Sequence, residues 1–128
     1  NFTNGDYVQL GTSFNSLIFG ISDFTVETWF KTSMTDGTLI SKRSICNVSN
    51  FWNLRISAGK IRWEMMEAGG ANLVDLSTPL TYNNNLWHHV AVTRNGSLVK
   101  IYMDGYTVVN TNSAALTNLI APDPIKLG

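Results

Sequence analysis

Apolar and polar residues alternate with a period of two along much of this sequence, and this pattern constrains the fold more than any other feature. Between residues 24 and 31, Phe24 and Val26 belong to one side of the chain, while Glu27 and Trp29 belong to the other. The same alternation recurs in the segments 51–57, 60–66 and 98–104. Such segments are typical of strands that bury one face and leave the other wetter. No stretch keeps helical apolar spacing for three turns, so we expect an all-β protein.

Short turn motifs separate these segments. Ala58-Gly59, Asn95-Gly96 and Asp104-Gly105 each stand between two strand-like runs. A type I′ turn needs positive φ at both central residues, which favours Asn-Gly and Asp-Gly, so we expect type I′ turns at these positions. The pattern predicts a hairpin over 51–66 and a three-stranded meander over 86–110.

Weaker signals complete the predicted organisation. Further strand candidates are the segments 6–10, 38–43 and 72–76. The segment 77–85 contains Pro79 and a run of three Asn, and we interpret it as a crossover between hairpins. Many short strands with frequent turns indicate an antiparallel β-sandwich. We expect one domain over residues 1–128, because the chain has no repeat or linker-like tract.

Charge and composition exclude several classes of function. Only 14% of residues are charged, and nine basic residues balance nine acidic ones. We therefore expect no nucleic-acid partner and no attraction to an anionic membrane. No apolar run approaches the roughly 18 residues of a membrane helix, so we expect no membrane insertion. Because Cys46 is the only cysteine, no disulfide can form within the chain.

Five motifs follow one another in an order that resembles a known family. They are Asn4-Gly5-Asp6-Tyr7-Val8 and the segments 24–31, 37–42, 87–94 and 100–105. The chain resembles the laminin-G-like jelly roll of the concanavalin A-like lectin/glucanase superfamily. Family members usually have one strand before the first motif and a final strand after a segment like 125–128. The resemblance thus implies a concanavalin A-like jelly roll that lacks outer strands at its termini, within a longer protein. Many relatives bind a structural calcium where the first and last strands meet, which implies that role for Asp6.

The residues do not predict catalysis. Glycanases of this fold use paired carboxylates on one strand face. The nearest pair is Glu64 and Glu67, whose spacing of three places them on opposite faces of a strand. His88 and His89 are adjacent on a predicted strand, so they also face opposite ways and cannot share one metal ion. We therefore expect a protein that is not an enzyme.

Sugar binding has more physical support. Lectin sites stack an aromatic ring on a sugar and fix its hydroxyl groups with planar polar side chains. The wetter faces of three predicted strands offer such groups, and the predicted ligand-binding residues are Glu27, Trp29, Asn53, Arg55, Arg62 and Glu64. Trp29 is unusual on an otherwise hydrophilic face, and the alternative is that it packs into a second layer. Trp52 and Trp63 lie on the apolar side of their predicted strands, so we expect them in the core.

These observations favour a carbohydrate-binding or adhesion module of a larger extracellular or cell-surface protein. The expected partners are a glycan or surface protein and neighbouring domains of the same polypeptide. The alternatives are a protein-binding or spacer module without a glycan site, or a diverged glycanase domain. Both remain open, because this fold carries many functions.

Overall fold

The computed structural model describes residues 6–10, 18–43, 49–112, 116–121 and 123–128. Ten strands follow one another: β1 (Val8–Leu10), β2 (Phe24–Lys31), β3 (Gly37–Lys42), β4 (Phe51–Ser57), β5 (Lys60–Met66), β6 (Val74–Thr81), β7 (Trp87–Asn95), β8 (Leu98–Met103), β9 (Tyr106–Asn112) and β10 (Ile125–Leu127). A short 3₁₀ turn, η2 (Ala68–Gly70), follows β5. None of the described residues forms a helix long and apolar enough to cross a membrane.

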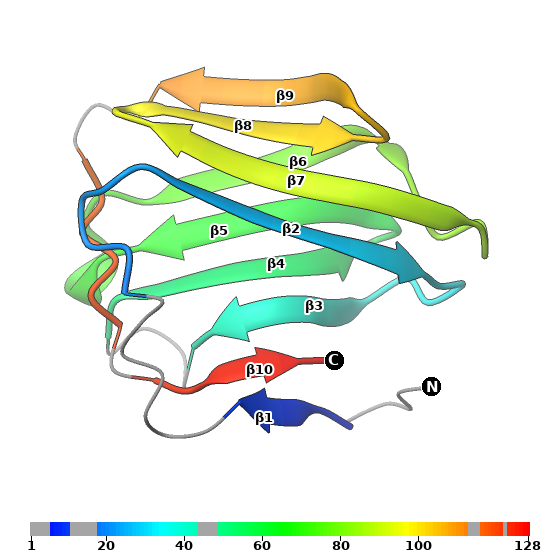
Figure 1. Ribbon diagram of the computed structural model, residues 1–128, viewed down its shortest axis with the longest axis horizontal. Helices are drawn as coiled ribbons and strands as arrows, with labels where there is room; N and C mark the ends of the chain where they lie inside the picture. Colours follow the sequence, from blue (N-terminus) through cyan, green and yellow to red (C-terminus); the bar gives the residue numbers. More distant parts are fainter. Residues whose placement is uncertain (1–5, 11–17, 44–48, 113–115, 122) are drawn as a thin grey trace.

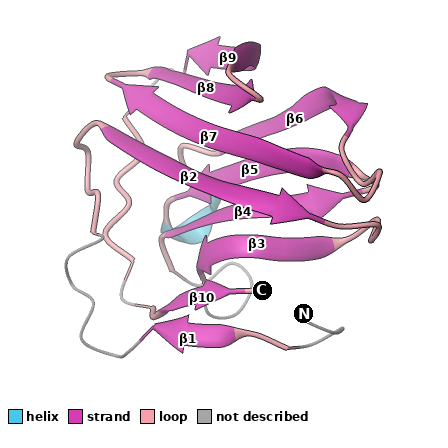
Figure 2. Cartoon of the chain, turned by 45° about the vertical axis from the view of Figure 1, so that its right-hand side comes forward, coloured by secondary structure: helices cyan, strands magenta, loops and turns pink. Residues whose placement is uncertain are grey.

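The strands form two antiparallel sheets that stack face to face (Figures 1 and 2). One sheet has six strands in the order β1-β10-β3-β4-β5-β6, and the other has four in the order β2-β7-β8-β9. The predicted all-β antiparallel sandwich is confirmed. The hairpin β4–β5 and the meander β7–β8–β9 also lie where alternation predicted them. The strand expected over 72–76 continues to Thr81, and the one expected over 6–10 is confined to β1.

Pro79 lies inside β6, so the prediction that the segment 77–85 is a crossover was wrong for its first half. Proline lacks a backbone N–H, but an edge strand can accommodate it where that position faces away from the neighbouring strand. β6 is the edge of the six-stranded sheet, and its register with β5 shifts between Lys60 and Arg62. The edge position thus explains why the strand tolerates a residue that favours a turn.

Two of the three hairpin turns have the expected geometry. Ala58 and Gly59 both have positive φ, at 51° and 77°, and so do Asp104 and Gly105, at 51° and 88°. The third turn is one residue later than predicted, because Asn95 still pairs with Leu98 at the end of the ladder. Of its central residues only Gly96 has positive φ, as a type II′ turn requires.

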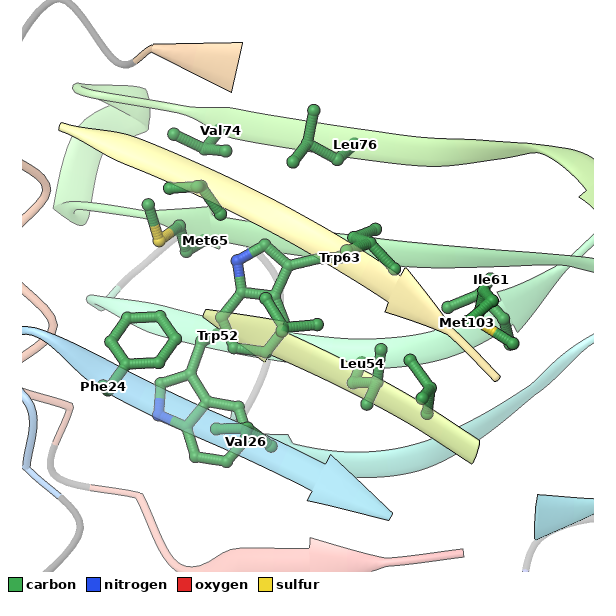
Figure 3. Close-up of a cluster of buried hydrophobic side chains, with 14 of the residues drawn as sticks. Phe24, Val26, Trp52, Leu54, Ile61, Trp63, Met65, Val74, Leu76 and Met103 are labelled. Atoms are coloured by element: carbon green, nitrogen blue, oxygen red, sulfur yellow. The ribbon is translucent and has the colours of Figure 1, made fainter. Parts of the chain in front are cut away.

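Aromatic and aliphatic side chains fill the space between the sheets (Figure 3). Trp52 and Trp63 are 1% and 0% exposed, which confirms the prediction that they belong to the core. Their rings stack with centroids 5.7 Å apart, and Phe24 packs on Trp63 at 5.6 Å. Truncating either indole to Ala would cost about 3–5 kcal/mol, because the cavity could not close around the loss.

Arg94 closes one end of the sandwich. Its guanidinium donates hydrogen bonds to the carbonyl oxygens of Gly20, Ser22 and Thr117, and it stacks 4.9 Å above the ring of Phe24. Burial lowers the pKa of Arg94, but an arginine stays charged in proteins. This side chain therefore ties two loop segments, distant in sequence, to the end of β7.

Candidate functional site

The structure separates the six predicted ligand residues into two groups. Glu27 and Trp29 lie on β2 in the four-stranded sheet, whereas the other four lie on β4 and β5 in the six-stranded sheet. Both groups alternate with buried residues that point into the core, so each group faces outward from its own sheet. The six residues therefore occupy opposite faces of the sandwich and do not form one site.

The first surface, which we call the tryptophan face, consists of Glu27, Trp29, Trp87 and His89. Trp29 is paired with His89 across β2 and β7, and their ring centroids are 5.1 Å apart. Trp87 is the outward residue two positions before His89. Trp29 and Trp87 are 64% and 65% exposed, so the alternative that Trp29 packs into a second layer was wrong. The indole of Trp29 and the imidazole of His89 thus lie together, and the exposed indole of Trp87 lies two residues away along the same face of β7.

Sequence reasoning missed Trp87 and His89. Both alternate with the buried residues Val90 and Val92 along β7, and this signal was present in the sequence. The adjacent histidines do face opposite ways, as predicted. His88 Nδ1 lies 2.9 Å from Asp104 Oδ2, whereas His89 Nε2 lies 3.7 Å from Glu27 Oε2 on the outer face.

A shallow hollow of about 490 Å³ lies farther along the same sheet. Thr25, Thr93, Lys100 and Tyr102 line it, together with residues at the end of β7. Thr25, Thr93 and Lys100 form one row across three strands. The row begins with the small threonines on β2 and β7 and continues with the longer Lys100 on β8. The tryptophan face thus borders a polar depression whose hydroxyl and ammonium groups can form hydrogen bonds.

The second surface, which we call the arginine face, consists of Arg43, Asn53, Arg55, Arg62 and Glu64. The Glu64 carboxylate is the centre of three ion pairs, with Arg55 Nε at 3.0 Å, Arg62 Nη2 at 3.2 Å and Arg43 Nη1 at 3.9 Å. The side chain of Glu64 is only 13% exposed. It is thus a carboxylate constrained by three arginines.

Asp75 on β6 extends this ion-pair network. Both of its carboxylate oxygens accept hydrogen bonds from Arg62, at 2.8 Å from Nε and 2.5 Å from Nη2. This hydrogen bonding lowers the pKa of Asp75 and raises the pKa of Arg62. Arg62 is thereby fixed in one orientation between two carboxylates.

Three buried polar atoms on the arginine face lack a hydrogen-bond partner: Asn53 Oδ1, Arg55 Nε and Glu64 Oε2. Arg55 Nε and Glu64 Oε2 are close enough for an ion pair, but their geometry is not that of a hydrogen bond. Asn53 is only 6% exposed, although it faces away from the core. Arg55 and Glu64 thus still neutralise each other's charge, although the contact is an ion pair and not a hydrogen bond.

The remaining candidates for catalysis and metal binding lie apart from these two faces or at their edges. Glu67 follows β5, and the backbone N–H of Asn118 donates to its carboxylate, which lowers the pKa of Glu67. Asp6 is exposed just before β1, and within the described ranges no three His, Cys, Asp or Glu side chains gather as metal ligands. The calcium role of Asp6 stays a prediction. Cys46 lies outside the described residues.

Comparisons with known proteins agree with this architecture. A family model of the laminin G type, described as the concanavalin A-like lectin/glucanases superfamily, matches residues 2–127. No curated protein sequence matches the chain. Domains LG4-5 of the mouse laminin α1 chain are similar in structure, with a TM-score of 0.69 and 17% identity over 83% of this chain and 28% of that one.

Two bacterial proteins are also similar in structure. The binding domain of botulinum neurotoxin serotype D has a TM-score of 0.75 and 21% identity over 97% of this chain and 32% of that one. The CBM40 domain of the Ruminococcus gnavus IT-sialidase has a TM-score of 0.75 and 15% identity over 96% and 77%. The chain spans about a third or less of the laminin and neurotoxin chains. The family match covers nearly the whole sequence, so the chain belongs to the concanavalin A-like lectin/glucanases superfamily and folds as a laminin-G-like jelly roll.

Proposed function

We propose that this chain is a non-catalytic carbohydrate-binding module of a larger extracellular or cell-surface protein. The observation that carries the proposal is the tryptophan face, where two indoles more than 60% exposed lie on the outer surface of one sheet. Exposed indoles of this kind stack on the apolar faces of sugar rings. Glu27, His89 and the neighbouring hollow supply polar groups for the hydroxyl groups of the sugar.

The similar structures support a binding role. One is named a receptor-binding domain of botulinum neurotoxin D, and another is the CBM40 domain bound to α2,3-sialyllactose. The absence of catalysis is part of the proposal, because Glu64 and Asp75, which face each other across β5 and β6, both form ion pairs with arginines. A protein-binding module is the alternative, since exposed aromatic residues are also frequent in protein interfaces.

A glycan array probed with the folded protein tests this proposal. We expect the wild-type protein to bind a defined set of glycans and Trp29→Ala or Trp87→Ala to weaken that binding at least tenfold. Tyr106→Ala is the matched control, because Tyr106 is 77% exposed but pairs with the inward-facing Met103 and so does not belong to the tryptophan face. It should bind like the wild type.

Two results would contradict the proposal. A folded wild-type protein that binds no glycan would favour the protein-binding alternative. Glycan binding that survives both tryptophan substitutions would show that the ligand does not use the tryptophan face.

A further inference from the structure

His88 is nearly enclosed at the start of β7. Its side chain is 12% exposed, and its ring lies 5.8 Å from the ring of Phe30 on β2 and 5.2 Å from the ring of Tyr82. Asn84, in the loop between β6 and β7, and Asp104, in the β8–β9 turn, place oxygen atoms against the imidazole. Because little water reaches the ring, these two side chains have to satisfy its nitrogen atoms.

Both ring nitrogens of His88 face an oxygen atom. Nδ1 lies 2.9 Å from Asp104 Oδ2, and Nε2 lies 3.0 Å from Asn84 Oδ1. The Asn84 atom in that position is the oxygen, because it also accepts a hydrogen bond of 3.0 Å from the backbone N–H of Leu86. The amide nitrogen in its place would set a donor against a donor. The imidazole is thus held between two acceptors.

Asp104 is ionised at neutral pH and so can only accept. Burial raises its pKa, but the hydrogen bonds from the His88 ring and the backbone N–H of His89 outweigh this effect, and the pKa is lowered. Burial and the nearby carboxylate raise the pKa of Tyr82, whose hydroxyl is therefore neutral, and the contact from β2 is the uncharged ring of Phe30. A neutral imidazole has one donor and one acceptor nitrogen, whereas an imidazolium donates from both.

The two oxygen-bearing side chains hold the backbone on both sides of Trp87. On one side, Asn84 Oδ1 accepts the N–H of Leu86. On the other side, Asp104 Oδ1 accepts the N–H of His89 at 2.9 Å, and the N–H of Asp104 donates to the carbonyl oxygen of His89 at 2.9 Å. The imidazole that joins these two side chains therefore closes a frame around an exposed indole of the tryptophan face.

We infer that His88 is an imidazolium in the folded protein and that this charged bridge positions Trp87 on the tryptophan face. Once the bridge loses a proton, its bare nitrogen and Asn84 Oδ1 repel each other, because both are acceptors. Asn84 then turns away, and Leu86 loses the acceptor of its backbone N–H. Rising pH therefore loosens Trp87. The effect of this change on glycan binding rests on the proposed function.

NMR of the ¹⁵N-labelled protein tests the bridge without any ligand. We expect both ring nitrogens of His88 to carry a proton at pH 7, and the indole Nε1–H signal of Trp87 to move as alkaline pH removes one of them. The indole signals of Trp52 and Trp63, which lie in the core, should stay in place. A bare ring nitrogen in His88 at pH 7 would overturn the inference. A Trp87 signal that does not follow the loss of the proton would overturn it too.

Asn84→Asp should strengthen the bridge, because a carboxylate can accept from both His88 Nε2 and the N–H of Leu86. We expect His88 to keep both protons to a pH at least one unit higher than in the wild type, and the Trp87 signal to move over the same higher range. Asn110→Asp is the matched control, since it adds the same charge at an exposed position of β9, beside Lys100. Equal effects of the two variants would show that only the net charge matters and would overturn the inference.

The glycan array separates this inference from the proposed function. An array without a bound glycan would refute sugar binding at the tryptophan face, and the NMR results would still decide whether the bridge exists. For a glycan that the array identifies, isothermal titration calorimetry should give an affinity that falls at least threefold between pH 6 and pH 9. The fall should be smaller in Asn84→Asp. Equal affinity at the two pH values, although His88 has lost its proton, would overturn the inference.

Discussion

Single charged residues that are buried or nearly buried stabilise specific parts of this sandwich. Arg94 is 2% exposed and satisfies three backbone carbonyl groups at one end of the core. Glu64 gathers three arginines on an outer face, with 13% of its side chain exposed. A buried charge with several partners is far more costly to break than an exposed ion pair.

We expect Arg94→Met to lower the free energy of unfolding by about 3 kcal/mol, because it keeps much of the buried volume but leaves the carbonyl oxygens of Gly20, Ser22 and Thr117 without their donor. Urea denaturation measures this loss. Lys100→Met, on the outer face of the same sheet, is the control and should change stability by less than about 0.5 kcal/mol. Similar losses in both variants would mean that the carbonyl contacts contribute little.

Asp75 predicts a dependence of stability on pH. Its pKa in the folded protein is lowered by the hydrogen bond from Arg62, so its charged form stabilises the fold. That contribution is complete above the unfolded value of about 3.9 and is lost as the pH falls through the lower folded pKa. We expect Asp75→Asn to have a lower melting temperature than the wild type at pH 7, and the gap to shrink below pH 4. A gap that stays constant down to pH 2 would contradict this assignment.

At the scale of strands and turns, local sequence determined most of what could be predicted. Alternation located the long strands because apolar and polar residues alternate along any strand that buries only one face. It could not locate the end of β6, because Pro79 is tolerated only through the edge position of that strand. Nor could it predict that Trp29 and Arg55 lie on different sheets, because the sheet that a strand joins depends on pairing between distant segments. β2, for example, pairs with β7, which is more than 50 residues later in the sequence.

The β4–β5 turn offers a test of local geometry. Gly59 has φ of +77°, and a Cβ there would lie 2.7 Å from Asn83 Oδ1 and 3.2 Å from Thr81 Cγ2. Gly96 also has positive φ, but a Cβ added to it would meet no atom within 4 Å. Both Ala substitutions incur backbone strain of about 1–2 kcal/mol, and only Gly59→Ala adds a steric clash.

We therefore expect Gly59→Ala to lower the melting temperature more than Gly96→Ala does. Differential scanning calorimetry of the two variants compares them directly. Equal losses would show that Asn83 and Thr81 move aside without cost, and that the turn conformation alone requires glycine.

At the scale of the whole molecule, two of the four tryptophans are buried and two are exposed. Trp52 and Trp63 are enclosed between the sheets, whereas Trp29 and Trp87 face solvent from one of them. We expect acrylamide to quench only the fluorescence of the exposed pair in the folded protein. The double variant Trp29→Phe/Trp87→Phe should have emission at shorter wavelength and resist quenching until the protein unfolds. Strong quenching of that variant in its folded state would contradict the enclosed positions of Trp52 and Trp63.

The two terminal strands also determine how the molecule responds to a mechanical load. β1 and β10 are antiparallel neighbours (Figure 1), and Val8 pairs with Leu127 at one end of their ladder. A force pulling residues 8 and 127 apart acts across this ladder and not along it. The three residue pairs of the ladder then separate one after another, starting with Val8 and Leu127. Tension would release β1 first and leave both outer faces of the sandwich intact.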